Sequence, residues 1–153
     1  MEKGQEMTVN PKHRELVKAI ATGETGRAHE LNGQVSASER NDYHTFVTAF
    51  FSIMLEHRFE EDSSRDAIAK FVDEMRYDYR KADPPIKPLM LEGLIRASCG
   101  DEHLLAEISA EDTIQGEYQI IRKIALQSDD VIPQIDKYLS EAESLVQEWD
   151  EEP

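Results

Sequence analysis

The stretch Ser36–Phe59, SASERNDYHTFVTAFFSIMLEHRF, decides the fold of this chain. Ser36 and Glu39 stand three residues apart, which is the spacing of a capping box, so we expect a helix over 37–59. Its apolar residues recur at helical spacing and form one broad face: Tyr43, Phe46, Val47, Phe50, Ile53 and Met54, with Phe51 and Leu55 beside them. A helix that is apolar over so much of its circumference usually lies at the centre of a bundle.

Helix signals continue on both sides of this stretch, and no segment alternates apolar and polar residues for long enough to predict a strand. Asn10-Pro11 is typical of a helix start, Gly23 of a helix end, and Pro84-Pro85 of a firm stop. We expect helices at 10–22, 25–31, 65–82 and 87–98, a short one capped by Asp101, one that opens at 109–112, and a last one capped by 128–130. The prediction is an all-α, single-domain helical bundle of about five main helices plus one or two short helices.

The domain limits follow from the same pattern. Residues 1–9 are polar and lack periodicity, so we expect them to be disordered. The bundle domain should cover 10–150, followed by an acidic end at 151–153. At 153 residues the chain is long enough to bury a core without metals or disulfides.

The charge balance restricts the classes of partner. The formal net charge is −15 and the pI is about 4.6. Nucleic acids and anionic membrane surfaces are bound largely through Lys and Arg, so direct binding to either is not expected. A basic protein is the favoured partner, at least in encounter rate.

The chain contains one cysteine, Cys99, which excludes an intramolecular disulfide and favours a reducing compartment. No basic stretch followed by an apolar one opens the sequence, and the longest apolar clusters are far shorter than a membrane span. We therefore expect a soluble cytoplasmic protein.

The last stretch, 128–153, carries nine acidic residues against one base, Lys137. Its apolar residues alternate at gaps of three and four and so line one helix face: Ile132, Ile135, Leu139, Ala142, Val146 and Trp149. Packing of this stripe on the protein's own bundle is the simpler interpretation, with the acids as a solvated face. The alternative is a docking helix whose acids meet a basic partner. The residues expected to bind that partner are Asp136, Glu143, Glu148, Trp149 and Asp150.

Catalytic and metal-binding patterns are weak. His57 and Glu61 share a helix face, but a metal site needs at least three convergent ligands. Cys99 and His103 stand four apart, yet Asp101 and Glu102 between them disfavour a reactive thiolate. No phosphate-binding glycine loop, nucleophile elbow or Glu-x-x-His pair occurs. We therefore predict no catalytic residue, cofactor or metal, while an undetected helical enzyme remains an alternative.

The leading hypothesis is a non-enzymatic acidic interaction module, such as an adaptor, regulator or inhibitor of a more basic protein. One alternative is a small-molecule-binding bundle with a pocket lined by Phe46, Phe50, Phe51 and Met54. Another is a homodimer through the seam of the last helix. A basic and aromatic segment, 75–81, could hold a nucleotide or an acidic peptide, although pairing with acids of the same protein is the simpler interpretation.

Overall fold

Helices make up most of the computed structural model, which describes residues 9–151. The α-helices are α1 (Pro11–Thr22), α2 (Thr25–Asn32), α3 (Arg40–Arg58), α4 (Arg65–Asp78), α5 (Pro88–Ser98), α6 (Ala110–Gln127) and α7 (Ile135–Glu151). Two 3-10 helices, Ala37–Glu39 and Glu102–Glu107, lie before α3 and α6. No strand occurs within 9–151, so the prediction of an all-α single domain is confirmed. The expected disorder concerns residues that lie outside the described ones, except Val9, which is buried.

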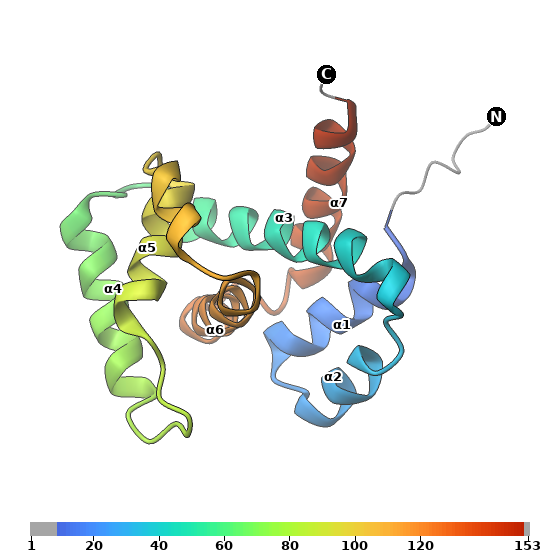
Figure 1. Ribbon diagram of the computed structural model, residues 1–153, viewed down its shortest axis with the longest axis horizontal. Helices are drawn as coiled ribbons and strands as arrows, with labels where there is room; N and C mark the ends of the chain where they lie inside the picture. The colour runs from blue at the N-terminus through green and yellow to red at the C-terminus, as the bar shows by residue number, and fades with distance from the viewer. Residues whose placement is uncertain (1–8, 152–153) are drawn as a thin grey trace.

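Helix α3 occupies the centre of the bundle, as its broad apolar face predicts (Figure 1). It packs against α1, α5, α6 and α7. Its side chains supply a large share of the core, and the buried ones are Tyr43, Phe46, Val47, Ala49, Phe50, Phe51, Met54 and Leu55. The positions of α1, α5, α6 and α7 therefore depend on the surface of α3 that each one covers.

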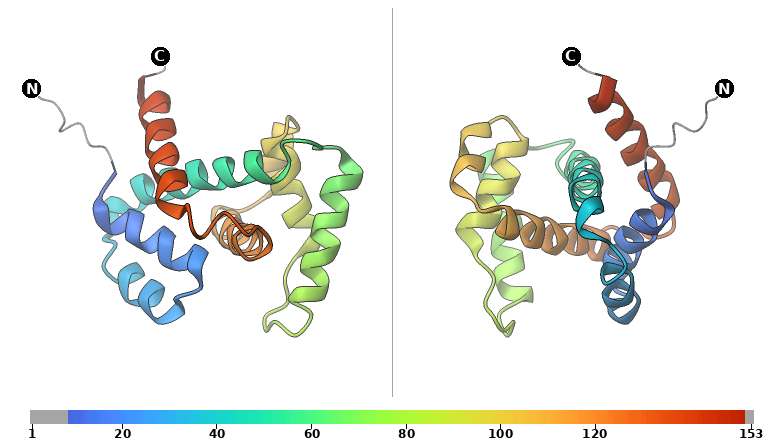
Figure 2. Two further views of the ribbon diagram at one scale, coloured as in Figure 1. Left: turned by 180° about the vertical axis from the view of Figure 1, so that it is seen from behind. Right: turned by 45° about the vertical axis from the view of Figure 1, so that its right-hand side comes forward.

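The remaining helices form two groups around α3 (Figures 1 and 2). Helices α1 and α2 pack on each other near the start of α3, and α1 also reaches α6 and α7. Helices α4 and α5 form a second pair at the opposite end of α3. Helix α6 joins the two groups, because it contacts α1, α3 and α5.

Local signals set most helix ends where the sequence predicts them. The side chain of Asn10 accepts a hydrogen bond from the backbone N–H of Lys12, and Gly23 ends α1 with a left-handed φ of 81°. Ser36 and Glu39 form the expected capping box. Ser64 and Ser109 cap α4 and α6 through hydrogen bonds from backbone N–H groups.

Two predicted boundaries are wrong. Helix α4 ends at Asp78 instead of residue 82, because 79–82 close tighter turns before Pro84 and Pro85. The last helix begins at Ile135 instead of 128–130, because 129–134 form turns that hold Pro133, which has no N–H to donate. Ile132, expected on the apolar stripe, is therefore 39% exposed, and Val131 is buried in its place.

Gly116 illustrates how packing reverses an expectation from helix propensity. A glycine inside a helix costs about 1 kcal/mol relative to alanine. Here Gly116 is buried against α5, and an added Cβ would clash with Leu94 and lie 3.2 Å from Met90 Sδ and 3.3 Å from Leu91 Cδ2. The glycine therefore permits the close approach of α5 and α6.

We predict that Gly116→Ala lowers the free energy of unfolding by about 1–3 kcal/mol, because the core at this position is already filled. Gly93→Ala is the matched control, since its Cβ would meet Ile108 Cδ1 at an ordinary 3.7 Å. Gly93→Ala should raise the free energy of unfolding by up to about 1 kcal/mol, because alanine favours a helix more than glycine does. Urea denaturation of both variants measures the difference, and stabilisation by Gly116→Ala would contradict the packing argument.

Candidate functional site

The apolar stripe of α7 faces the bundle. Its buried residues are Ile135, Tyr138, Leu139, Ala142 and Val146, and α7 packs chiefly on α3. The interpretation that this stripe packs on the protein's own bundle is therefore confirmed. Because the protein's own helices cover these side chains, the alternative of a homodimer through this seam would require α7 to leave the bundle.

Two of the five predicted partner-binding residues bind bases of the same chain. The carboxylate of Asp136 lies 3.3 Å from Lys18 Nζ and 3.5 Å from Arg14 Nη2. Glu143 Oε2 accepts a hydrogen bond from Arg14 Nη1 at 3.0 Å. Arg14 also donates to the backbone carbonyl of Asp136. These acids therefore join α7 to α1.

The other three predicted residues lie nearer the end of α7. Glu148 and Asp150 are exposed and form no ion pair within residues 9–151. Trp149 is half-buried and packs against the core, where it lines a shallow hollow with His44, Thr45 and Thr48 of α3. Asp136 and Glu143 therefore bind α7 to α1, whereas Glu148 and Asp150 remain at the surface.

A groove between α3 and α7 brings Glu148 together with two acids that the sequence analysis did not single out. Its volume is about 340 Å³, and its lining residues are Ser52, Ile53, Glu56, Glu141, Ser144, Leu145 and Glu148. Ile53 and Leu145 are partly buried and pack against the core, so they give the groove an apolar floor. Glu56, Glu141 and Glu148 are exposed around it and form no ion pair within residues 9–151. We call this the acidic groove.

The acidic groove continues along the second half of α3. A hollow of about 260 Å³ shares Ser52 and Glu56 with the groove and adds Leu55, Phe59 and Cys99. Glu60 belongs both to that hollow and to a cleft of about 650 Å³ between the end of α3 and α4. The hollow therefore shares side chains with both the acidic groove and the cleft.

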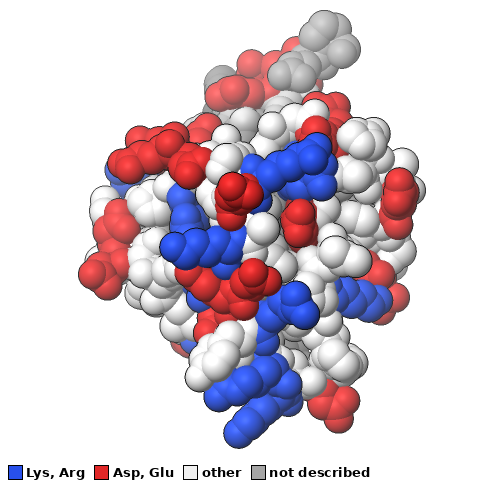
Figure 3. All heavy atoms as spheres, turned by 90° about the vertical axis from the view of Figure 1, so that its left-hand side faces the viewer, with Lys and Arg blue, Asp and Glu red and all other residues white. Residues whose placement is uncertain are grey.

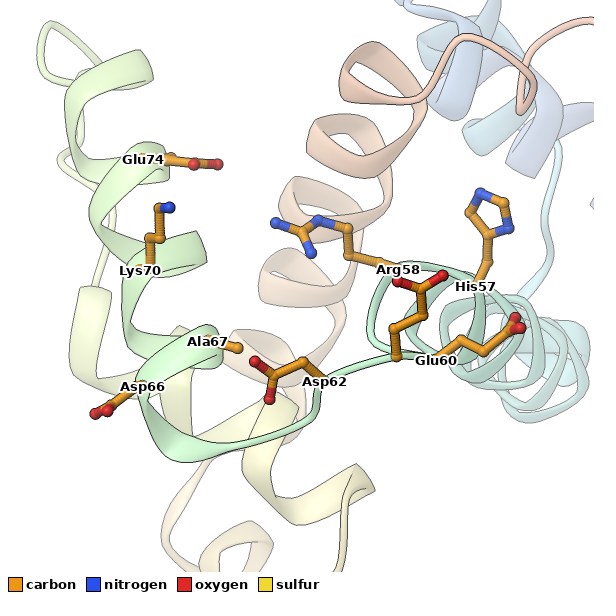
Figure 4. Close-up of a pocket in the computed structure, with 9 residues that line it drawn as sticks. His57, Arg58, Glu60, Asp62, Asp66, Ala67, Lys70 and Glu74 are labelled. Carbon is orange, nitrogen blue, oxygen red and sulfur yellow. The ribbon is translucent and has the colours of Figure 1, made fainter.

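The cleft between α3 and α4 is lined almost entirely by charged residues (Figure 4). Arg58 extends from α3 toward α4, and Lys70 and Glu74 lie on the opposite wall. Arg58 Nε donates to Gln127 Oε1 at 2.7 Å, and Gln127 donates to Glu74 at 2.8 Å. These hydrogen bonds tie both walls to α6 and fix the width of the cleft.

His57 lies at the border of this cleft, but its neighbours do not form a metal site. Its Nε2 lies 3.4 Å from Asp130 Oδ1, and its Nδ1 lies 3.4 Å from the hydroxyl of Tyr138. Within residues 9–151 no group of three or more His, Cys, Asp or Glu side chains has the arrangement needed to hold a metal ion. The contacts of His57 instead join α3 to the start of α7.

The remaining sequence candidates occupy structural positions. Phe46, Phe50, Phe51 and Met54 are all buried in the core, with exposed fractions of 2% or less. Cys99 is exposed, but neighbouring atoms still remove part of its hydration. This partial desolvation and the negative charge of Asp101 raise the pKa of the thiol, which disfavours a reactive thiolate.

The basic segment 75–81 pairs locally and not with the last helix. Arg76 lies 3.7 Å from Asp73, and the guanidinium of Arg80 lies over the ring of Tyr77. Figure 3 shows acids and bases intermingled on the face of the molecule that carries α4. The surface there is mixed in charge, in contrast to the acidic groove.

Glu117, a residue that no sequence pattern marks as functional, is only 3% exposed on α6. Its carboxyl oxygens accept the hydroxyl of Thr48 at 3.1 and 3.2 Å. Burial raises the pKa of Glu117 to about 8, and the hydrogen bond from Thr48 offsets part of that rise. A carboxyl with so high a pKa is a feature of catalytic acids, but Glu117 lies between α3 and α6 and lines neither the groove nor the cleft.

Comparison of the chain with known protein families, with curated proteins and with solved structures gave no match. Among the helices described, none is both long and apolar enough to cross a bilayer.

We predict that Glu143→Gln lowers the free energy of unfolding by about 1 kcal/mol, because it removes a partly buried ion pair with Arg14. Asp150→Asn is the control, since Asp150 forms no ion pair within residues 9–151, and it should leave stability unchanged. Thermal melts at low and high salt test this pair. Equal melting temperatures for the two variants would refute the assigned role of Glu143.

Glu117 should make the protein less stable as the pH rises. The folded state keeps the proton up to about pH 8, whereas the unfolded chain loses it near the ordinary value of 4.5. Stability from this group is therefore complete below pH 4.5 and declines toward pH 8, by at most about 1.4 kcal/mol per pH unit. We predict that Glu117→Gln removes this decline and is more stable than the parent at pH 8. Urea denaturation at several pH values would show parallel curves for the two proteins if the prediction is wrong.

Proposed function

We propose that this protein is a non-enzymatic interaction module that binds a more basic protein through the acidic groove. The observation that carries the proposal is the combination of an apolar floor, Ile53 and Leu145, with a rim of Glu56, Glu141 and Glu148. None of these three acids forms an ion pair within residues 9–151. Stable interfaces combine the same elements, an apolar centre and a polar rim of complementary charge.

The contrast with the other acids of α7 supports this choice of surface. Asp136 and Glu143 have bases of α1 within 3.5 Å, so their charges contribute to the fold. Glu141 and Glu148 lie on the same helix and have no such partner among the described residues. Like charges that approach each other without a counter-charge destabilise a helical surface, so a basic partner would relieve their repulsion.

A small-molecule site is supported less well. The cleft between α3 and α4 has the volume of such a site, but Ala67 is the one apolar residue among the described residues that line it. Sites for small molecules are lined predominantly by apolar and aromatic side chains. The core phenylalanines that could have formed an apolar pocket are instead packed against their neighbours.

The proposal predicts that reversing the groove charges abolishes partner capture. The immobilised full chain, used on lysate from its native cells at low and moderate salt, should retain a basic protein that leaves as salt rises. The variant Glu56→Lys/Glu141→Lys/Glu148→Lys should lose that protein. The matched control Glu15→Lys/Glu102→Lys/Glu107→Lys changes the net charge equally at exposed positions elsewhere and should retain it.

Melting temperatures of both variants establish that they are folded. Because Glu56 and Glu148 lie in the last turns of α3 and α7, lysine there suits the helix dipole and should not unfold the protein. Retention of the same partner by the groove variant, or its equal loss from the control, would refute the proposal.

A further inference from the structure

We infer that the occupant of the acidic groove is a Lys/Arg-rich segment with one large aliphatic side chain, which rests between Ile53 and Leu145. This inference rests on the proposed function and specifies the form of the partner. It follows from the kinds of side chain that line the acidic groove and the hollow beside it.

The order of the lining residues sets the pattern of the segment. Ile53 and Leu145 offer an apolar contact in the groove, where Glu56, Glu141 and Glu148 surround it. Further along α3, Leu55 and Phe59 lie under the hollow with Glu56 and Glu60 at its edges. A segment in which basic residues precede and follow one aliphatic residue would therefore meet apolar and acidic side chains in the matching order.

The cleft beyond the hollow is more mixed in charge. Arg58 and Lys70 extend into it (Figure 4), and its lining also holds the acids Glu60, Glu61, Asp62, Asp66 and Glu74. A run of bases would meet two like charges there among five opposite ones, whereas the described residues that line the groove and the hollow include no Lys or Arg. The stretch of uniformly acidic lining therefore ends at Glu60.

The test uses two labelled peptides of equal charge, Lys-Ala-Lys-Leu-Lys-Ala-Lys and its counterpart with serine in place of leucine. Fluorescence anisotropy with the purified full chain should show that the leucine peptide binds roughly tenfold more tightly, as expected for burial of one leucine side chain. The variant Glu56→Gln/Glu141→Gln/Glu148→Gln should weaken both peptides at least tenfold. The control Glu15→Gln/Glu102→Gln/Glu107→Gln should weaken neither by more than about twofold, as distant surface charges are screened.

Leu145→Ala separates the apolar contact from the charge. It should weaken the leucine peptide and leave the serine peptide unchanged, so that the preference between the two peptides disappears. Equal binding of the two peptides by the parent protein, or equal losses in the groove and control variants, would overturn the inference, because attraction would then reflect net charge alone.

The outcomes distinguish this inference from the proposed function. If neither peptide binds but the lysine reversal still removes the captured partner, the partner presents a folded surface, and the inference fails while the function stands. If the peptides bind as expected but no basic protein depends on the groove, the proposed function fails.

Discussion

Burial of the broad apolar face of α3 is the constraint on which the rest of the structure depends. Eight of its side chains are buried, so neighbouring helices must supply apolar surface along its length. Helix α7 does so with its own stripe, and this packing leaves its acidic residues on the flanks of the helix. Helix α6 covers another side and brings two polar groups with it, Tyr118, which hydrogen-bonds to Tyr43, and Glu117, which accepts the hydroxyl of Thr48. The acidic groove exists because α7 lies along α3 and their solvent-facing side chains meet at the boundary.

The acids of α7 divide into two populations by what lies opposite them. On the side that faces α1, Arg14 and Lys18 neutralise Asp136 and Glu143. On the side that faces the second half of α3, Glu141 and Glu148 meet Glu56, another acid. One flank of α7 therefore binds the helix to α1 through ion pairs. The other flank faces a further acid and so forms a surface of negative charge. The net charge of −15 does not by itself reveal this division, since it counts both flanks alike.

The sequence predicts the fold class, most helix ends and the central place of α3, because helical periodicity and capping residues act within one or two turns. Boundaries failed where several turn-forming residues stand in succession, as at 79–82 and 129–134, and where Pro133 has no N–H to contribute. Of the expected site residues, Glu148 lies in the groove, whereas Asp136 and Glu143 do not remain free. That difference depends on where α1 places Arg14 and Lys18, which lie more than a hundred residues away in sequence. Glu117 carries no local signal of burial, and heptad spacing alone could not have indicated it.

Cys99 is well placed for attaching a fluorescent label. It is the one cysteine in the chain, it is exposed, and it lines the hollow that adjoins the acidic groove, beside Glu56 and Glu60. A maleimide dye would therefore attach at a single position, without any substitution to remove competing thiols. Since the pKa of this thiol is raised, less of it is thiolate near neutral pH, so labelling there needs a longer reaction. The native chain thus carries its own attachment point for a fluorophore next to the surface whose occupancy one would want to observe.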